Sequence, residues 1–125
     1  MRFKRSKFGV RQDSLSKIAR TVNGKLCASQ GEALRYRELI LLESQNAISN
    51  LKYQVRFPLI VNGEKITTYI ADFTYNVPHH IDLVVEDFKG FQTPEFKLKW
   101  KLLKVLHPQG FQFVLSGRGA KSLRH

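Results

Sequence analysis

The chain has 125 residues, of which 42% are hydrophobic and 25% are charged, and its formal net charge is +11 at pH 7. This length suits one globular domain, no apolar run approaches the roughly 20 residues of a membrane span, and the basic N-terminus lacks the apolar segment of a secretory signal. The single cysteine, Cys27, excludes an internal disulfide and a cysteine-based zinc site.

The positive charge is concentrated at the two ends of the chain. Residues 1–12 form a predicted basic arm and residues 116–125 a predicted basic tail, and the single predicted domain at 13–115 is nearly balanced in charge. Such arms suit a polyanion, because lysine and arginine contact nucleic-acid phosphates without reading sequence. A tail that serves only solubility is the alternative, and an anionic membrane surface is disfavoured because the arms lack amphipathic periodicity. The arm and tail residues expected to bind DNA are Arg2, Lys4, Arg5, Lys7, Arg11, Arg118 and Lys121.

The first part of the predicted domain holds a weak helix signal and then a strong one. The sequence of residues 13–28 is compatible with a loop, a short hairpin or a short helix. Residues 29–46 predict a long helix, because Ser29 and Glu32 have the spacing of a capping box and apolar residues recur behind them at helical intervals.

Three strands are expected after the long helix. Residues 53–60 alternate in polarity, with the apolar side chains on one shared face, and Pro58 indicates an edge strand. An Asn-Gly pair then predicts a hairpin to a second strand at 66–75, and a turn leads to a third strand at 81–89. These strands would form the body of a sheet.

A second helix and a last strand complete the predicted domain. Thr93 at the N-cap and Pro94 at the first helical position predict the helix, and residues 111–115 predict a short strand. Lys97 and Lys101 share a stripe of this helix, which is either a solvated face or a contact for DNA phosphates. The order α-β-β-β-α-β predicts an α/β (α+β) fold with a mixed central sheet flanked by helices, in which the last two strands run parallel.

Acidic residues occur where two of the predicted strands should be buried, and charge is costly there unless a partner uses it. Asp72 lies in the second strand, and Asp87 and Lys89 point to the same face of the third. If these strands are antiparallel neighbours, the two aspartates project side by side and repel each other unless a cation lies between them. Mg²⁺ suits such a pair, because it takes one or two carboxylates and keeps waters for a substrate phosphate. Glu32 offers a third carboxylate, whereas Glu86 should face away from Asp87.

These residues resemble the PD-(D/E)xK motif of Mg²⁺-dependent nucleases. Asp72 within IADF and the later Asp87-Phe88-Lys89 look like the motif itself, and the predicted element order is similar to the restriction-endonuclease-like αβββαβ core. More narrowly, the chain resembles a family of small, mostly uncharacterised phage-associated proteins of that superfamily. The resemblance covers roughly residues 28–115 in four blocks, GEALRYRELILLE, YIADFTY, VVEDFKG and TPEFKLKWKLL.

The resemblance implies hydrolysis of DNA phosphodiesters with Mg²⁺, for which Mn²⁺ is expected to substitute. Asp72 and Asp87 would be metal ligands, Glu32 would be a third ligand or a water-positioning acid, and Lys89 would be the catalytic lysine. The D-x-K spacing favours Asp87 over Glu86 as the ligand, and the replacement of the motif's proline by alanine removes no metal contact. Each residue also has a structural alternative, since the acids would serve as a helix cap or in surface ion pairs and the lysine would solvate a strand end.

The expected activity is that of a small DNA endonuclease in the cytoplasm of a phage host. The short chain leaves little room for a base-reading domain, so recognition of DNA structure is expected, with branched DNA such as a Holliday junction as the preferred substrate and a homodimer as the assembly. Two other classes stay open, a nucleic-acid-binding protein without catalysis and a subunit of a phage DNA-packaging or replication assembly. RNA also stays open as the substrate.

Overall fold

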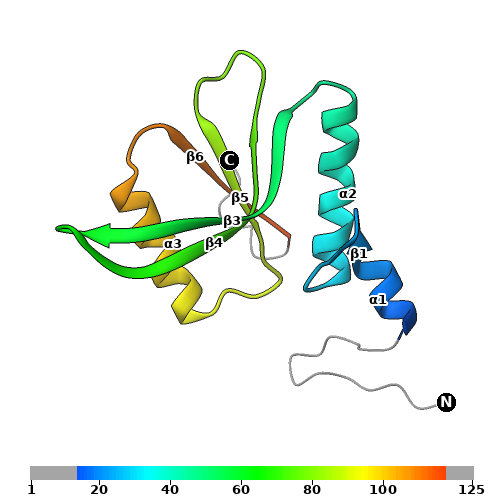
Figure 1. The fold of residues 1–125 in the computed structure, drawn as a ribbon, viewed down its shortest axis with the longest axis horizontal. Coiled ribbons are helices and arrows are strands. Elements are labelled where there is room, and N and C mark those ends of the chain that lie inside the picture. The colour runs from blue at the N-terminus through cyan, green and yellow to red at the C-terminus, as the bar shows by residue number, and fades with distance from the viewer. Residues whose placement is uncertain (1–13, 118–125) are drawn as a thin grey trace.

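A four-stranded mixed sheet lies between two long helices in the computed structural model, which describes residues 14–117 (Figure 1). The predicted α/β (α+β) class and the αβββαβ order are confirmed, with a short helix and a small hairpin before them. The arm at 1–12 and the residues from 118 onward lie outside the described part, together with the predicted DNA contacts of both. The elements are α1 (Ser14–Arg20), β1 (Thr21–Val22), β2 (Lys25–Leu26), α2 (Gln30–Ser44), β3 (Ser49–Val61), β4 (Glu64–Asn76), β5 (Leu83–Phe88), α3 (Pro94–Leu106) and β6 (Phe111–Ser116).

The order of strands in the main sheet is β3-β4-β5-β6. The strand pairs β3/β4 and β4/β5 are antiparallel, and β5/β6 is parallel, as predicted for the strands on either side of the second helix. Strand β3 forms one edge, which agrees with the expectation from Pro58, because proline has no N–H to give to a neighbouring strand.

Both long helices begin at the predicted caps. The Ser29 hydroxyl accepts the N–H of Glu32 at 3.1 Å, and the Thr93 hydroxyl accepts the N–H of Phe96 at 3.1 Å. The open region before α2 contains the short helix α1 and the β1–β2 hairpin, whose turn carries the left-handed Asn23 (φ 54°). Within residues 14–117, no helix has the length and apolar character needed to cross a membrane.

The two long helices cover opposite faces of the sheet and create two hydrophobic cores. Val84 packs in the core beneath α2, whereas its neighbour Val85 packs in the core beneath α3 with Trp100 and Leu103. Because adjacent residues of a strand point to opposite faces, β5 separates the two cores. The end of β5 is therefore reached by groups from both helices.

The β3–β4 hairpin bends sharply where it passes from one core to the other (Figure 1). Tyr53 packs against the α2 core, but Phe57 and Leu59 pack against the α3 core. The prediction that the apolar residues of 53–60 share one face is therefore wrong for the strand as a whole. Its physical cause is local, because Gln54 adopts a left-handed backbone (φ 60°) in mid-strand and interrupts the alternation.

Candidate functional site

The two predicted aspartates lie where the β4/β5 ladder ends. The last paired residues are Phe73 and Glu86, so Asp72 and Asp87 occupy the next opposed positions on antiparallel neighbours, as predicted. Asp72 is 7% exposed and Asp87 is 1% exposed. Two carboxylates are thus largely removed from water at one end of the sheet.

The Asp72 carboxylate takes the place of a missing ladder partner. Its Oδ2 accepts the backbone N–H of Phe88 at 2.9 Å, and the amide of Gln54 lies 3.5 Å from Oδ1. Burial raises the pKa of Asp72 to about 7, and the charge of Glu32 adds to the rise, while the Phe88 N–H and the Lys89 ammonium oppose it. A group that titrates near neutrality can bind either a proton or a cation.

Asp87 is paired with the predicted lysine. Lys89 Nζ lies 3.2 Å from Asp87 Oδ1 as an ion pair, and the Tyr69 hydroxyl donates to Oδ2. Burial raises the pKa of Asp87 to about 7 even though Lys89 attracts the ionised form, and Glu32 raises it further. The ammonium of Lys89 also lies 4.6 Å from the ring centroid of Phe96. The lysine therefore faces the carboxylate and the start of α3 together.

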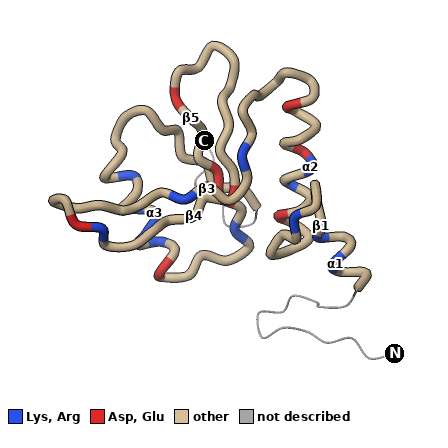
Figure 2. The backbone as a smooth tube through the Cα atoms, viewed as in Figure 1, with Lys and Arg blue, Asp and Glu red and all other residues tan. Residues whose placement is uncertain are grey.

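Glu32 reaches the same region from the first turn of α2. It is 5% exposed, the Tyr53 hydroxyl donates to its Oε2 at 2.6 Å, and the N–H of Ala28 lies 3.5 Å from the same oxygen. Its charge acts on both aspartates. The structure thus opposes Asp72 to Asp87 and pairs Asp87 with Lys89, whereas Glu32 acts on the two aspartates through its charge and bonds to Tyr53 and Ala28. Acidic and basic segments meet where β3, β4 and β5 converge (Figure 2).

The donor set of this cluster suits a hard divalent cation held by few protein ligands. Among the described residues, no group of three histidine, cysteine or acidic side chains is arranged to hold a metal. Asp72 and Asp87 nevertheless provide the one or two carboxylates that Mg²⁺ commonly takes from a protein, and their raised pKa values reflect desolvation that a cation would offset. Glu32 is engaged by Tyr53, which fits a water-positioning acid better than a third direct ligand.

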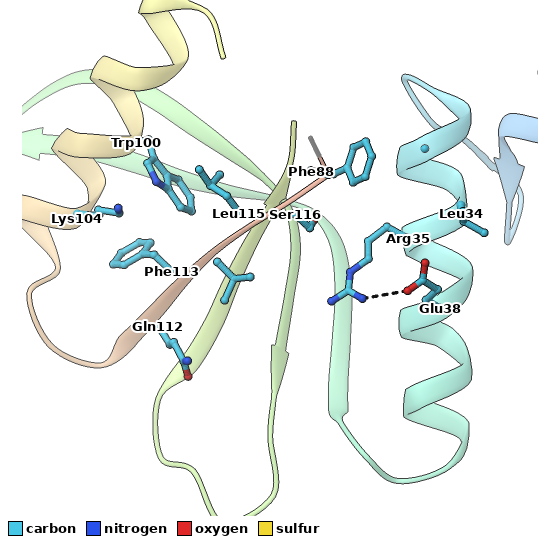
Figure 3. A pocket seen from close by; sticks show the side chains of 13 residues that line it. Leu34, Arg35, Glu38, Phe88, Trp100, Lys104, Gln112, Phe113, Leu115 and Ser116 are labelled. Carbon is cyan, nitrogen blue, oxygen red and sulfur yellow. Dashed lines mark hydrogen bonds and ion pairs between the residues drawn. The ribbon is translucent and has the colours of Figure 1, made fainter. Parts of the chain in front are cut away.

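A small pocket opens beside the aspartate–lysine pair. It has a volume of about 250 Å³, lies between β4 and the start of α3, and is lined by Asp87, Lys89, Tyr69 and Lys99 among others. A larger pocket of about 780 Å³ runs along β6 between α2 and α3, but neither Asp87 nor Lys89 lines it (Figure 3). We assign the candidate site to the smaller pocket because Asp87 and Lys89 line it, although Asp72 and Glu32 do not.

The sequence interpretation placed Glu86 correctly but missed what it does. Glu86 faces away from Asp87, as expected, and its side chain is fully buried. Arg35 donates hydrogen bonds to both of its carboxylate oxygens, at 2.6 Å through Nε and at 2.9 Å through Nη2. Burial alone would raise the pKa of Glu86, but the hydrogen bonds, chiefly from Arg35, hold it below its usual range. A buried strand acid signals that it needs a partner, although no sequence pattern identified Arg35.

The predicted DNA-binding lysines of the second helix lie on the solvent side of α3. Lys97 and Lys101 are exposed, whereas Lys99 forms an ion pair with Glu95 at 3.0 Å. Basic positions recur along α3 in Figure 2. These lysines are therefore accessible to a polyanion near the pocket.

Comparison with known proteins gives one positive result. A family model described as "Protein of unknown function (DUF1064)" matches residues 12–119. No curated protein and no solved structure matches the chain.

Proposed function

We propose that this chain, which belongs to the DUF1064 family of proteins of unknown function, is a Mg²⁺-dependent deoxyribonuclease of the PD-(D/E)xK type. One observation carries the proposal. Two buried aspartates on adjacent antiparallel strands have pKa values raised to about 7, and a lysine lies 3.2 Å from one of them. Desolvated carboxylates beside a cationic side chain are typical of a catalytic site more than of a structural ion pair.

Asp72 and Asp87 would hold the metal, which when bound supplies a Lewis acid and a water of lowered pKa. The Tyr69 hydroxyl and the Phe88 N–H fix the orientations of the two carboxylates. Lys89 lines the pocket that would receive the scissile phosphate, and its ammonium would offset the negative charge that develops on the phosphoryl oxygens. Glu32 would orient the attacking water and accept its proton.

Structured DNA is the proposed substrate. Lys97 and Lys101 on α3 would contact backbone phosphates, with the basic arm and tail adding sequence-independent affinity. Branched DNA such as a four-way junction is the proposed preference, with recognition through DNA structure more than through base sequence. A junction requires two cuts, so we propose a two-fold symmetric dimer. The proposed setting is the cytoplasm of a phage host.

A cleavage assay tests the activity and its selectivity together. Four-way junction, nicked duplex and linear duplex are incubated with the wild-type chain in Mg²⁺, in Mn²⁺ and in EDTA, with a matched RNA duplex as a further substrate. Cleavage is expected with either metal and to be fastest on the junction. Asp72→Asn should abolish it while preserving an acceptor for the Phe88 N–H. Equal rates on linear duplex and junction would reject the branched-DNA proposal.

A binding protein without catalysis is the second candidate, alone or within a phage DNA-processing assembly. It is favoured by the absence, within residues 14–117, of three side chains arranged around a metal. In that case the wild-type chain would bind DNA in a salt-dependent manner but would cleave no substrate in either metal. Asp72→Asn would then leave the affinity for DNA unchanged, as would the addition of EDTA.

A further inference from the structure

A second buried polar cluster lies on the opposite face of β5 from Asp87. At its centre is the fully buried Glu86 carboxylate. Besides the two bonds from Arg35, this carboxylate accepts the hydroxyls of Tyr75 at 2.7 Å and Ser116 at 2.9 Å. Four elements, α2, β4, β5 and β6, therefore meet at one side chain, and four donated hydrogen bonds satisfy its oxygens.

Two members of this cluster are close in sequence to members of the candidate site. Arg35 follows Glu32 by about one helical turn on α2, and Glu86 directly precedes Asp87 on β5. The Arg35–Glu86 bond consequently joins the two elements that carry Glu32 and Asp87. It does so without contacting the pocket that Asp87 lines, since neither residue lines that pocket.

The other two members are linked to the remaining site residues. Tyr75 lies three residues after Asp72 on β4, and the backbone oxygen of Ser116 accepts the N–H of Lys89 at 2.9 Å. Each of the four site residues thus has a neighbour or a bonded partner in the Glu86 cluster.

The first turn of α2 also packs directly against β5. A Cβ atom on Gly31 would lie 2.6 Å from Cζ of Phe88, so only glycine permits the observed approach. Figure 3 shows Phe88 beside this end of α2 and Arg35 extending from the helix toward the sheet. Helix α2 is therefore held against β5 by ring packing at its N-terminus and by the guanidinium one turn later.

Energetics favours a geometric role for this ion pair over a stabilising one. Removing two charges from water carries a large desolvation cost, and well-packed apolar replacements are often no less stable. An apolar pair cannot reproduce the fixed orientation of this ion pair, because a guanidinium bound through two nitrogens fixes the planes of both side chains. Arg35 also contacts Glu38 at 3.3 Å, but Glu38 is half exposed and lies on the same helix.

We infer that Arg35 and Glu86 are a pair of positioning residues that fixes α2 against β5 and so sets the position of Glu32 relative to Asp87 and Lys89. The catalytic consequence rests on the proposed nuclease function, whereas the positioning itself does not. Arg35 and Glu86 act through Glu32 and Asp87, and they touch neither a metal nor a phosphate.

The test replaces both members at once, so that no buried charge is left unpaired. In the double variant Arg35→Met/Glu86→Met, backbone hydrogen exchange is measured by NMR at Phe88 and Lys89, and at Val85 as a core reference. Positioning predicts exchange at least about tenfold faster at the first two amides, with Val85 and Tm little changed. In the cleavage assay, kcat should fall at least about tenfold while KM stays within about twofold.

Two single variants complete the design. Glu38→Gln removes only the exposed contact of Arg35 and should match the wild type in exchange and in kcat. Arg35→Lys keeps the positive charge but loses the bond through two nitrogens. It should show the faster exchange at Phe88 and Lys89 in a chain that still has an ion pair at this position. If the double variant fails to fold, Arg35→Lys decides the question.

The outcomes separate this inference from the proposed function. Unchanged exchange at Phe88 and Lys89 in the variants would overturn the positioning role, whatever the activity. A wild-type chain that cleaves nothing would reject the nuclease proposal, and faster exchange in the same variants would still support the positioning role. Uniformly faster exchange at all three amides with a lowered Tm would reveal a merely stabilising pair and overturn the inference.

Discussion

Asp72 and Asp87 are both buried carboxylates, and each is bonded to a different set of neighbours. Asp72 receives a backbone N–H where the ladder ends, and Asp87 receives a lysine and a tyrosine hydroxyl. Neither set of contacts offsets burial, so both pKa values are raised to about 7. Sequence alternation predicted the opposed positions of the two residues. It contained no information on Tyr69, which lies on β4, 18 residues from Asp87 in the chain, and donates its hydroxyl to that carboxylate.

Stability without a divalent cation should decrease as the pH rises. The folded pKa values of about 7 exceed the unfolded value of about 3.9, so the folded state binds more protons between these limits. The free energy of unfolding therefore falls from about pH 4 to about pH 7. Scanning calorimetry in EDTA should show this fall in Tm, and Asp72→Asn should make it shallower. A Tm that rises across the window would contradict the raised values.

Divalent metal should reverse this loss above neutral pH, because a ligand that binds only the folded state stabilises it by mass action. Adding Mg²⁺ at pH 8 is expected to raise the Tm of the wild type, and the non-catalytic Ca²⁺ serves as a second cation. Asp87→Asn should remove most of the rise. Glu38→Gln, which changes an acid outside the site, is the control and should retain it.

Lys89 should affect the chemical step much more than DNA binding. Its side chain is 29% exposed and lines the pocket, where the ammonium would meet charge that develops during reaction. Lys89→Ala is expected to lower kcat by roughly a hundredfold or more. Fluorescence anisotropy on uncleaved DNA in Ca²⁺ should show affinity within about threefold of the wild type. A large loss of affinity with unchanged kcat would assign the lysine to binding instead.

At the scale of elements, local signals determined most of what the sequence could predict. Caps at Ser29 and Thr93 set both long helices, and the Asn-Gly turn set the β3–β4 hairpin. The bend at Gln54 was not predicted, because glutamine does not signal a left-handed backbone as the glycine or asparagine of a turn does. The Arg35–Glu86 pair was not predicted either, because 51 residues separate its members.

The contact between α2 and β5 makes Gly31 a sensitive position. Gly31→Ala would place a methyl group 2.6 Å from the Phe88 ring, so the helix or the ring must shift. Urea denaturation should show a loss of about 1–3 kcal/mol in the free energy of unfolding, as expected for overpacking. Gly90→Ala is the matched control, because a Cβ there meets no atom within 4 Å. Equal stability of the two variants would mean that the ring moves aside without cost.

At the scale of the whole molecule, the excess of positive charge lies mostly at the two ends of the chain. The chain has 21 basic and 10 acidic residues, and eight of the basic residues lie in the two end segments. Inside the domain, Lys89 pairs with Asp87 and Arg35 pairs with Glu86, while Lys97 and Lys101 are exposed on α3. Other basic residues lie on α1, α2, β2, β3 and β4. Composition predicts attraction to a polyanion, but it could not identify which polyanion.

Removal of residues 1–12 should weaken DNA binding and flatten its dependence on salt. The segment carries five basic residues and no acid. The slope of log affinity against log salt should fall by up to about 4.5 on duplex DNA if all five contact phosphates. Lys97→Ala/Lys101→Ala provides a comparison in which the slope should fall by up to about 1.8. A slope unaffected by the truncation would exclude the arm from phosphate binding.

The hydroxyl that Ser116 donates to Glu86 also has a consequence for timing. Strand β6 is the last element of the described chain to leave the ribosome, and Glu86 lacks one of its donors until then. The β3–β4 hairpin is local and can form early, but the bond from Ser116 to Glu86 forms only with β6 in place. If the positioning role and the proposed nuclease function both hold, a nascent chain would lack its full activity until β6 is added.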